Sequence, residues 1–431
     1  MNIIAIDIGA SFLKAGLFED GKLIRKVHLN SPRIESEWRE PVQIYKLLSM
    51  VKSAILNLSE GKREIVLSIS NEMHGFILTD ENGKPFTDYI SWQREFGNCL
   101  LKDGYTPIDY FKSCEKQIMA TGMPIRSGLP SVNLRYVLEA IGKDSGFFFT
   151  LGDYILFALS GKKPVCHPTN AAATGLYNLQ KEKWDINLIQ AAGGKNIYFP
   201  EVKFDVLEFD LNRVHILALP AVGDQQATLY GADFTNETDI SFNLGTGAQV
   251  SRLIDDIEFS AKWQIRPYFD GKHLKTIPHL PSGRAINVYF NFIKEIINRF
   301  NKGVSDDEIW KYIIGEASKS SKNTIKCDMS FFDNPCTDHK KGSITDIGEH
   351  DLTVGNLFNS VFAQMTNNFL WAADLISDGV QCTSRIVFSG GIATRISQIR
   401  ENVISHYPSA EVVIGSDESL KGLYKYAERM E

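Results

Sequence analysis

The sequence predicts an α/β protein of two similar lobes arranged around a cleft. The chain has 431 residues, more than one hydrophobic core usually serves, so two domains are expected. Apolar strand patterns alternate with segments of helical periodicity, as in a mixed α/β fold. A strand–turn–strand unit near the start also recurs in the second half, which indicates a duplicated domain.

The order of elements in the first half follows from periodicity and turn residues. Apolar runs bounded by turn residues predict strands, whereas apolar residues recurring every three or four positions predict helices. The expected strands are Ile3–Ile8, Leu13–Phe18, Leu23–Leu29 and Glu64–Ser70, followed by a hairpin over Gly75–Phe86 that closes at Asn82-Gly83. The expected helices are Val42–Leu58, Asn133–Ile141 and Asp153–Leu159.

The internal repeat pairs the first hairpin with a segment in the second half. Ile4–Leu17 (IAIDIGASFLKAGL) aligns at a constant offset with Ile240–Leu253 (ISFNLGTGAQVSRL), which places Asp7 on Asn243. Two buried hairpins can look alike by chance, because short strand patterns recur often. The favoured interpretation is nevertheless a duplicated domain.

The seam between the lobes is expected at Leu217–Asp224, LALPAVGD, because no long linker rich in Pro or Ser separates the halves. This seam gives an N-terminal lobe over 1–218 and a C-terminal lobe over 219–431. Two lobes joined so closely enclose a cleft, where ligands tend to bind.

Composition excludes several classes of protein. Hydrophobic residues make up 43% and charged residues 23%, as in an ordinary soluble globular protein, and the net charge of −6 argues against a nucleic-acid partner. No apolar run approaches the ~18–20 residues of a membrane span, and no signal peptide is recognisable, so no membrane partner is expected. Six scattered cysteines without a C-x-x-C pair fit a cytoplasmic location.

The turns of the two repeated hairpins have the composition of phosphate-binding loops. Gly9, Gly245 and the nearby Gly247 permit close approach to backbone N–H groups, and concavities of such groups bind phosphate. A carboxylate beside phosphates is repelled unless a cation intervenes, so Asp7 predicts Mg²⁺ held directly or through water. Lys14 could neutralise phosphate oxygens or be solvated, and the sequence favours neither.

The segment Val222–Ala232 offers a candidate general base. Asp224 follows an apolar stretch and precedes a helix of small residues. A carboxylate in the first turn of a helix is commonly an N-cap. Its place at the seam between the lobes favours instead a base that accepts a proton from a hydroxyl group.

Other segments suit a nucleotide and a sugar. Arg385–Arg395 predicts a buried strand, a Gly-Gly turn and a helix from near Ala393, which is a geometry for packing a nucleotide on backbone. NEMHG (Asn71–Gly75) and SWQR (Ser91–Arg94) supply the hydrogen-bonding groups and the indole that a polyol needs. The Walker A loop, the protein-kinase motifs and H-E-x-x-H are absent from the sequence.

Taken in order, these segments resemble the FGGY family of carbohydrate kinases, within the actin/hexokinase/Hsp70-like (ribonuclease H-like) fold. SNEMHGFIL and SWQR are similar to segments of xylulokinases and sedoheptulokinases, and GDQQA to the catalytic segment. IDIGASFLKAGLF and NLGTGAQVS resemble the two phosphate loops, and FSGGIATR the adenosine loop. GDYILFALSGK followed by TNAAATGLYNLQKEKWD matches a long family block, so the resemblance covers nearly the whole chain.

The resemblance implies ATP and Mg²⁺ as cofactors and a small-molecule sugar as substrate. It implies that Asp224 is the base and that Asp7 organises Mg²⁺–ATP. The other residues implied in cofactor binding are Gly9, Ser11, Lys14, Gly245, Thr246, Gly390 and Gly391. The residues implied in sugar binding are Met73, His74, Trp92, Arg94 and Gln225.

The chain departs from the family pattern at three places. Ala10 stands where the family usually has Thr, although Ser11 offers a hydroxyl group, and Asn133 stands where a signature has Lys. The segment Met329–Cys336, MSFFDNPC, matches poorly in a region that helps to shape the cleft. GDQQA and Gly342–Asn356 are most similar to the sedoheptulokinase branch, which points to a ketose.

The sequence therefore predicts a kinase that transfers the γ-phosphoryl group of ATP to a hydroxyl group of a sugar, such as sedoheptulose or xylulose. Two alternatives stay open: a nucleotide-dependent switch on the same fold, and an inactive sugar-binding relative. Association into a homodimer is compatible with the sequence.

Overall fold

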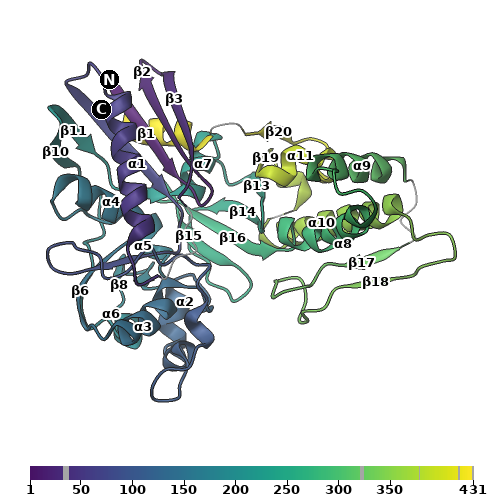
Figure 1. Cartoon of the computed structure of the whole chain (residues 1–431), viewed down its shortest axis with the longest axis horizontal. Helices are drawn as coiled ribbons and strands as arrows, with labels where there is room; N and C mark the ends of the chain where they lie inside the picture. Colours follow the sequence, from purple (N-terminus) through teal and green to yellow (C-terminus); the bar gives the residue numbers. More distant parts are fainter. Residues whose placement is uncertain (33–37, 321–324, 378, 416–417, 430–431) are drawn as a thin grey trace.

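Two β-sheets organise the computed structural model, which describes residues 1–32, 38–320, 325–377, 379–415 and 418–429 (Figure 1). In spatial order the first sheet contains β10 (Leu207–Leu211), β11 (Val214–Ala218), β4 (Glu64–Asn71), β1 (Asn2–Ile8), β2 (Phe12–Glu19) and β3 (Lys22–Asn30), with β12 (Val222–Gly223) beside β4. The second contains β15 (Gln264–Pro267), β16 (His273–Leu280), β14 (Ala248–Ile254), β13 (Asp239–Leu244), β19 (Arg385–Ser389) and β20 (Glu411–Ile414).

The sequence repeat is a structural repeat. In each sheet a first strand pairs antiparallel with the next strand and parallel with a later one: β1 with β2 and β4, and β13 with β14 and β19. Asp7 is registered against Ser70, and its counterpart Asn243 against Ser389. The second turn is shorter, because Leu244 pairs with Ala248, so the constant-offset alignment is wrong beyond the turn.

Helices cover both faces of the first sheet. Alternate residues of β1 point to opposite faces. Ile4, Ile6 and Ile8 pack in a core with α1 (Val42–Leu58) and α4 (Leu151–Ser160). Ile3 and Ala5 pack in another core with α7 (Asp224–Gly231) and α13 (Glu418–Glu428). Burial on both faces explains why β1 reads as an almost continuous apolar run.

The core that contains α7 and α13 draws on both sheets. It includes Val66 of the first sheet and Leu253 and Val387 of the second, so the last helix of the chain returns to the first lobe. Figure 1 shows α7 between the two sheets. The boundary between residues 218 and 219 stays a prediction.

Most expected elements of the first half are confirmed. The three opening strands, α1, β4, α3 (Pro130–Ile141) and α4 lie where the periodicity places them. The hairpin at Asn82-Gly83 is only partly formed. β5 (Ile77–Thr79) ends in a turn closed by a hydrogen bond from Asp80 N–H to Lys84 O, but the return strand is reduced to a bridge at Pro85. Proline has no N–H group and cannot continue the ladder.

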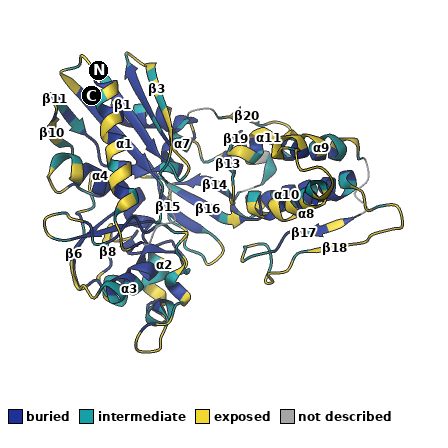
Figure 2. Ribbon diagram, viewed as in Figure 1, coloured by how far each residue is buried: buried dark blue, intermediate teal, exposed yellow. Residues whose placement is uncertain are grey.

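The second lobe adds a helical layer against its sheet. Helices α8 (Gly283–Phe300), α9 (Asp306–Lys319) and α10 (Val354–Ile376) share one large core with the sheet. In Figure 2 most strands of both sheets are largely buried, except the exposed edge strand β3, while the helices expose their outer faces. Among the described helices, none combines the length and the hydropathy needed to cross a bilayer.

Short elements complete the described structure. The strands are β6 (Ser145–Phe149), β7 (Tyr177–Asn178), β8 (Lys183–Trp184), β9 (Asn196–Tyr198), β17 (Lys326–Asp328) and β18 (Ser343–Thr345). The helices are α2 (Glu115–Ala120), α5 (Pro168–Ala172), α6 (Ile186–Ala191), α11 (Gly391–Arg395) and α12 (Ser397–His406), with 3-10 turns at Phe96–Asn98, Pro107–Phe111 and Val380–Cys382.

The contact between α7 and α13 depends on two glycines. A Cβ atom at Gly422 would lie 1.8 Å from Ala227 O, and one at Gly231 would lie 1.9 Å from Glu418 O. Gly422→Ala is therefore expected to separate the helices and to lower the free energy of unfolding by about 1–3 kcal/mol. Urea unfolding measures this change.

Gly315 of α9 provides the control, because no atom lies within 4 Å of the position of its Cβ. Gly315→Ala is expected to raise the free energy of unfolding by about 0.5–1 kcal/mol through helix propensity alone. Equal effects of the two substitutions would contradict close packing at Gly422.

Candidate active site

Asp7, one residue before the end of β1, is a buried carboxylate held from two distant parts of the chain. Its side chain is 8% exposed. Ser70 Oγ donates a hydrogen bond to Oδ1 over 2.9 Å, and Ser419 Oγ donates to Oδ2 over 2.7 Å. Burial raises the pKa of Asp7, although the two hydroxyl groups and Lys14 oppose that rise. Lys14 is registered opposite Asp7 on β2, so the two side chains share one face of the sheet.

The first turn is closed by its own backbone. Gly9 N–H donates to Phe12 O over 3.0 Å, so this N–H group is engaged within the turn rather than open. Ser11 is exposed, and its carbonyl accepts a hydrogen bond from Ser31 N–H. The hydroxyl group expected to compensate for Ala10 is therefore on an accessible residue.

The second turn is fastened to the start of α8. Gly245 O accepts hydrogen bonds from Ser282 Oγ and Gly283 N–H, and Thr246 O accepts from Arg284 N–H over 2.8 Å. Thr246 itself is exposed. These bonds fix the carbonyl side of the turn and leave the Thr246 hydroxyl accessible.

The Gly-Gly turn after β19 packs against the second hairpin turn. Gly390 has a φ of 90°, and a Cβ atom there would lie 2.5 Å from Leu244 O. Only glycine fits such an approach with that backbone conformation. No atom lies within 4 Å of the Cβ position of Gly391, which begins α11. The helix therefore starts two residues before the expected Ala393.

Asp224 is the first residue of α7, and the N-cap interpretation is wrong. The N-cap residue is Gly223, and no side chain caps this helix. Asp224 Oδ1 accepts a hydrogen bond from the neighbouring Gln225 N–H over 2.8 Å. Burial, then the negative charges of Asp7 and Glu72, raise the pKa of Asp224 to about 7, while Arg266 opposes the rise. A carboxyl group that titrates near neutral pH is suited to proton transfer.

Two of the residues expected to bind sugar adjoin Asp224. A Cβ atom at Gly223 would lie 2.5 Å from the Met73 sulfur, which places that thioether against the start of α7. Gln225 donates from Nε2 to Ser251 Oγ over 3.1 Å and accepts at Oε1 from Arg266 over 2.5 Å. These two bonds fix the Gln225 side chain to β14 and β15 of the second sheet.

His74 and Trp92 are held by hydrogen bonds that fix their polar atoms. His74 has a φ of 62° and bonds through Nδ1 to Ala173 O over 2.7 Å. Because a carbonyl only accepts, Nδ1 carries the proton and Nε2 is left as an acceptor. Burial and the charges of two arginines hold the pKa of His74 well below its usual value. Trp92 Nε1 donates to Glu72 Oε1 over 2.8 Å.

A cavity of about 740 Å³ joins the first turn to the SWQR segment. Its lining includes Gly9, Ala10, Glu72, Ser91 and Arg94. The structure thus brings an expected phosphate loop and an expected sugar segment to one cavity. Asp224 is also within electrostatic range of residues close to both turns. Asp7 acts on it directly, and Arg266, which acts on it too, donates to Gln249 just beyond the second turn. Convergence of the turns on one nucleotide stays a prediction.

Asn133, at a position where the family signature has Lys, organises the SWQR segment. Its Nδ2 donates to Arg94 O over 2.6 Å, and its Oδ1 accepts from Phe96 N–H over 3.2 Å. The side chain is buried. This departure therefore has a structural role beside the cavity.

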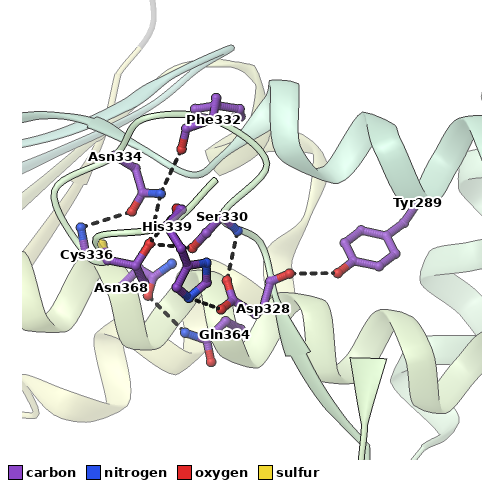
Figure 3. Close-up of polar contacts among 10 residues, drawn as sticks. Tyr289, Asp328, Ser330, Phe332, Asn334, Cys336, His339, Gln364 and Asn368 are labelled. Carbon is purple, nitrogen blue, oxygen red and sulfur yellow. Dashed lines mark hydrogen bonds and ion pairs between the residues drawn. The ribbon is translucent and has the colours of Figure 1, made fainter. Parts of the chain in front are cut away.

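The atypical segment Met329–Cys336 forms a compact loop between β17 and β18 (Figure 3). Asp328 accepts a hydrogen bond from Ser330 N–H, and its carboxylate lies 3.2 Å from His339 Nε2. Asn334 Nδ2 donates to Phe332 O over 3.0 Å.

This loop reaches the second hairpin turn through one side chain. The guanidinium of Arg284 lies 4.7 Å above the ring of Phe332, and Arg284 N–H bonds to Thr246 O. The segment therefore borders the expected phosphate loop, in keeping with a role in shaping the cleft.

The residues present fit a site for Mg²⁺ completed by phosphates. Mg²⁺ keeps several waters and is bound through one or two carboxylates together with substrate phosphates. Asp7 supplies such a carboxylate. No group of three His, Cys, Asp or Glu side chains suited to a metal occurs within the described ranges, so a cage made wholly of protein ligands is not found there.

Several site residues escaped the sequence analysis. Glu72 lies inside the NEMHG segment, which was singled out for its neighbours. Arg126, Arg266 and His279 carry no local motif and come from the loop before α3, from β15 and from β16. Ser419 lies on the last helix. Each gains its place only because distant segments pack together.

Comparison with known proteins gives a consistent picture. Residues 2–205 match the model of the "FGGY family of carbohydrate kinases, N-terminal domain". A glycerol kinase of Limosilactobacillus reuteri is 26% identical over 57% of this chain and 53% of its own length. A rhamnulokinase of Oceanobacillus iheyensis is 30% identical over 46% of this chain and 43% of its own. These matches span about half the length of the curated relatives.

The fold matches a solved structure over the whole chain. The crystal structure of a ligand-bound xylulose kinase from Lactobacillus acidophilus has a TM-score of 0.81 at 17% identity and covers 100% of this chain and 90% of that one. The two-lobed actin-like fold is confirmed.

The raised pKa of Asp224 predicts a pH-dependent stability. An unfolded Asp titrates near ~3.9, whereas Asp224 titrates at about 7. Between these values only the folded protein holds the proton. The contribution of Asp224 to the free energy of unfolding is therefore fully present below the unfolded pKa, and it is lost as the pH rises through about 7. Asp224→Asn, uncharged at every pH, is expected to leave the free energy of unfolding unchanged near pH 4 and to raise it by about 2–4 kcal/mol near pH 8.

Urea unfolding of both proteins at the two pH values measures this difference. A variant that is no more stable than the parent at pH 8 would show that ionisation of Asp224 does not lower the free energy of unfolding.

Proposed function

We propose that this relative of the FGGY carbohydrate kinases transfers the γ-phosphoryl group of ATP to a hydroxyl group of a carbohydrate. The observation that carries the proposal is the environment of Asp224. This carboxyl group starts a helix at the junction of the lobes, has a pKa of about 7, and lies between a buried acid at the first turn and the residues expected to bind sugar.

In the proposed reaction Asp224 acts as the general base. The acceptor oxygen attacks the γ-phosphorus, its proton passes to the Asp224 carboxylate, and the bond between phosphorus and the bridging oxygen breaks to release ADP. Neutral His74 accepts a hydrogen bond at Nε2 from a sugar hydroxyl group. Trp92 offers an aromatic face to the C–H groups of the sugar.

The hairpin turns hold the phosphates in this proposal. Thr246 and Ser11 supply hydroxyl donors, Lys14 supplies positive charge, and Gly390 and Gly391 leave backbone room for the adenosine. Asp7 holds Mg²⁺ through its carboxylate. When bound, Mg²⁺ would stabilise the negative charge on the phosphoryl oxygens. Closure of the lobes excludes water and limits hydrolysis of ATP.

The proposed acceptor is a sugar, with ketoses as the first candidates. The names of the relatives point to different substrates: glycerol, rhamnulose, gluconate and xylulose. The similarity of GDQQA and Gly342–Asn356 to the sedoheptulokinase branch favours sedoheptulose or xylulose. A screen of ADP release over ketoses, aldoses and polyols separates this function from a nucleotide-dependent switch, whose ATP turnover would ignore sugars, and from an inactive relative, which would transfer to none.

Asp224→Ala tests the base directly. The variant is expected to fold and to bind ATP, but its rate of sugar-dependent ADP release should fall by a factor of about 10²–10⁴, because a positioned base contributes that much. Steady-state kinetics at saturating ATP and sugar measure the loss.

Asp306→Ala is the matched control, because Asp306 also lies in the first turn of a helix, on the exposed start of α9. It should leave turnover within about twofold. Near-normal turnover of Asp224→Ala would remove Asp224 from the mechanism.

A further inference from the structure

Two arginines, Arg126 and Arg266, have no carboxylate partner among the described residues. Arg266 is 4% exposed, and among the described residues its guanidinium donates only to the side-chain oxygens of Gln225, Gln249 and Gln264. These acceptors are neutral amides. Within the described residues, Arg266 forms no salt bridge.

The hydrogen-bond donors of Arg126 are less completely paired than those of Arg266. Its Nε is buried and has no hydrogen-bond partner among the described residues, and no salt bridge to it is formed there. The backbone around it places the guanidinium next to the SWQR segment. A Cβ atom at Gly128 would lie 2.2 Å from Trp92 O and 3.7 Å from Arg126 Nη1.

The loop that carries Arg126 is hydrogen-bonded to the strand that carries Arg266, because Ile265 N–H donates to Gly122 O over 3.0 Å. Burial lowers the pKa of Arg126 and of Arg266 to about 10, and the charge of Arg126 adds to the shift of Arg266. Both arginines also depress the pKa of His74 and that of His279. His279 is exposed, so solvent reaches this group of side chains at His279.

Such an arrangement is costly without an anion. Buried charges are ordinarily paired, because an unpaired buried ion loses several kcal/mol of solvation. Two guanidinium groups within electrostatic range of each other add repulsion. Asp224 and Glu95 act on them only at a distance, and the neutral histidines do not compensate. Arg126, with a donor left over, is the residue placed to receive an anionic group.

We propose that the acceptor is a sugar acid, whose carboxylate binds at Arg126 and Arg266 while one of its hydroxyl groups reaches Asp224. The inference rests on the proposed kinase function and names its substrate class. A guanidinium donates two parallel N–H groups to a carboxylate, so a planar monoanion fits this site. A phosphate would bring a second negative charge close to Asp224 and Glu72. A ketose that carries an acid group keeps the ketose part of the proposed function but replaces the neutral sugars sedoheptulose and xylulose as the first candidate acceptor.

Matched pairs of acceptors test the inference. Each pair has nearly the same hydroxyl groups and differs in the acid: D-gluconate with D-glucitol, D-xylonate with xylitol, and 2-keto-D-gluconate with D-fructose. The acid of at least one pair is expected to have a kcat/KM about 10- to 100-fold above that of its neutral partner, because hydrogen bonds to a charged group are the strong ones. D-glucitol 6-phosphate serves as the phosphate probe.

Arg126→Gln tests whether Arg126 causes the preference for the acid over its neutral partner. Its kcat/KM for the preferred acid should fall about 10- to 100-fold, chiefly through KM, while the value for the neutral partner changes less than about threefold. Arg126→Lys keeps a charge and should retain part of the preference. Arg299→Gln, on the exposed last turn of α8, is the control and should change neither.

Calorimetric titration without ATP separates the two proposals. If the acid binds in preference to its neutral partner and Arg126→Gln loses this preference, the anion site is supported. If in addition no sugar is phosphorylated, only the proposed kinase function is contradicted. Neutral sugars phosphorylated as well as acids would overturn the inference and keep the kinase. Stronger binding of the sugar phosphate than of the acid would overturn the choice of a carboxylate.

Discussion

The burial of one carboxylate constrains much of this structure. Asp7 lies at the end of the first strand, and its two oxygens accept hydrogen bonds from Ser70 on β4 and Ser419 on α13. A buried carboxylate is unfavourable unless hydrogen bonds or a cation compensate the lost water. The two hydroxyl groups, far apart in the chain, therefore have to meet at one place. Satisfying Asp7 brings the last helix of the protein back onto its first sheet.

That return in turn positions Asp224. Helix α13 packs on α7 through Gly422 and Gly231, which let the two backbones approach closely, and α7 begins at Asp224. Two acids are thereby held near each other in a poorly solvated junction. The electrostatic cost appears as the raised pKa of Asp224, so the same packing that completes the fold produces a group able to exchange protons near neutral pH.

The duplication repeats the topology but not the charge. The first hairpin carries Asp7, whereas the second carries Asn243 at the equivalent position. An amide in the second copy avoids adding another negative charge to a cleft that already holds Asp7, Glu72 and Asp224. Positive charge enters instead from β15 and from the loop before α3. Negative charge is therefore contributed by Asp7, Glu72 and Asp224, and positive charge by Arg126 and Arg266.

The sequence by itself determined the strands of the repeated hairpin and the three longest helices of the first half, α1, α3 and α4, and it singled out Asp7 and Asp224, because these depend on local periodicity and on residues near turns. It could not supply Arg126, Arg266 or Ser419, which have no local pattern and meet the cleft only after separate segments pack. The titration of Asp224 likewise depends on neighbours far along the chain. Electrostatics and close packing act through space, so only the tertiary structure decided them.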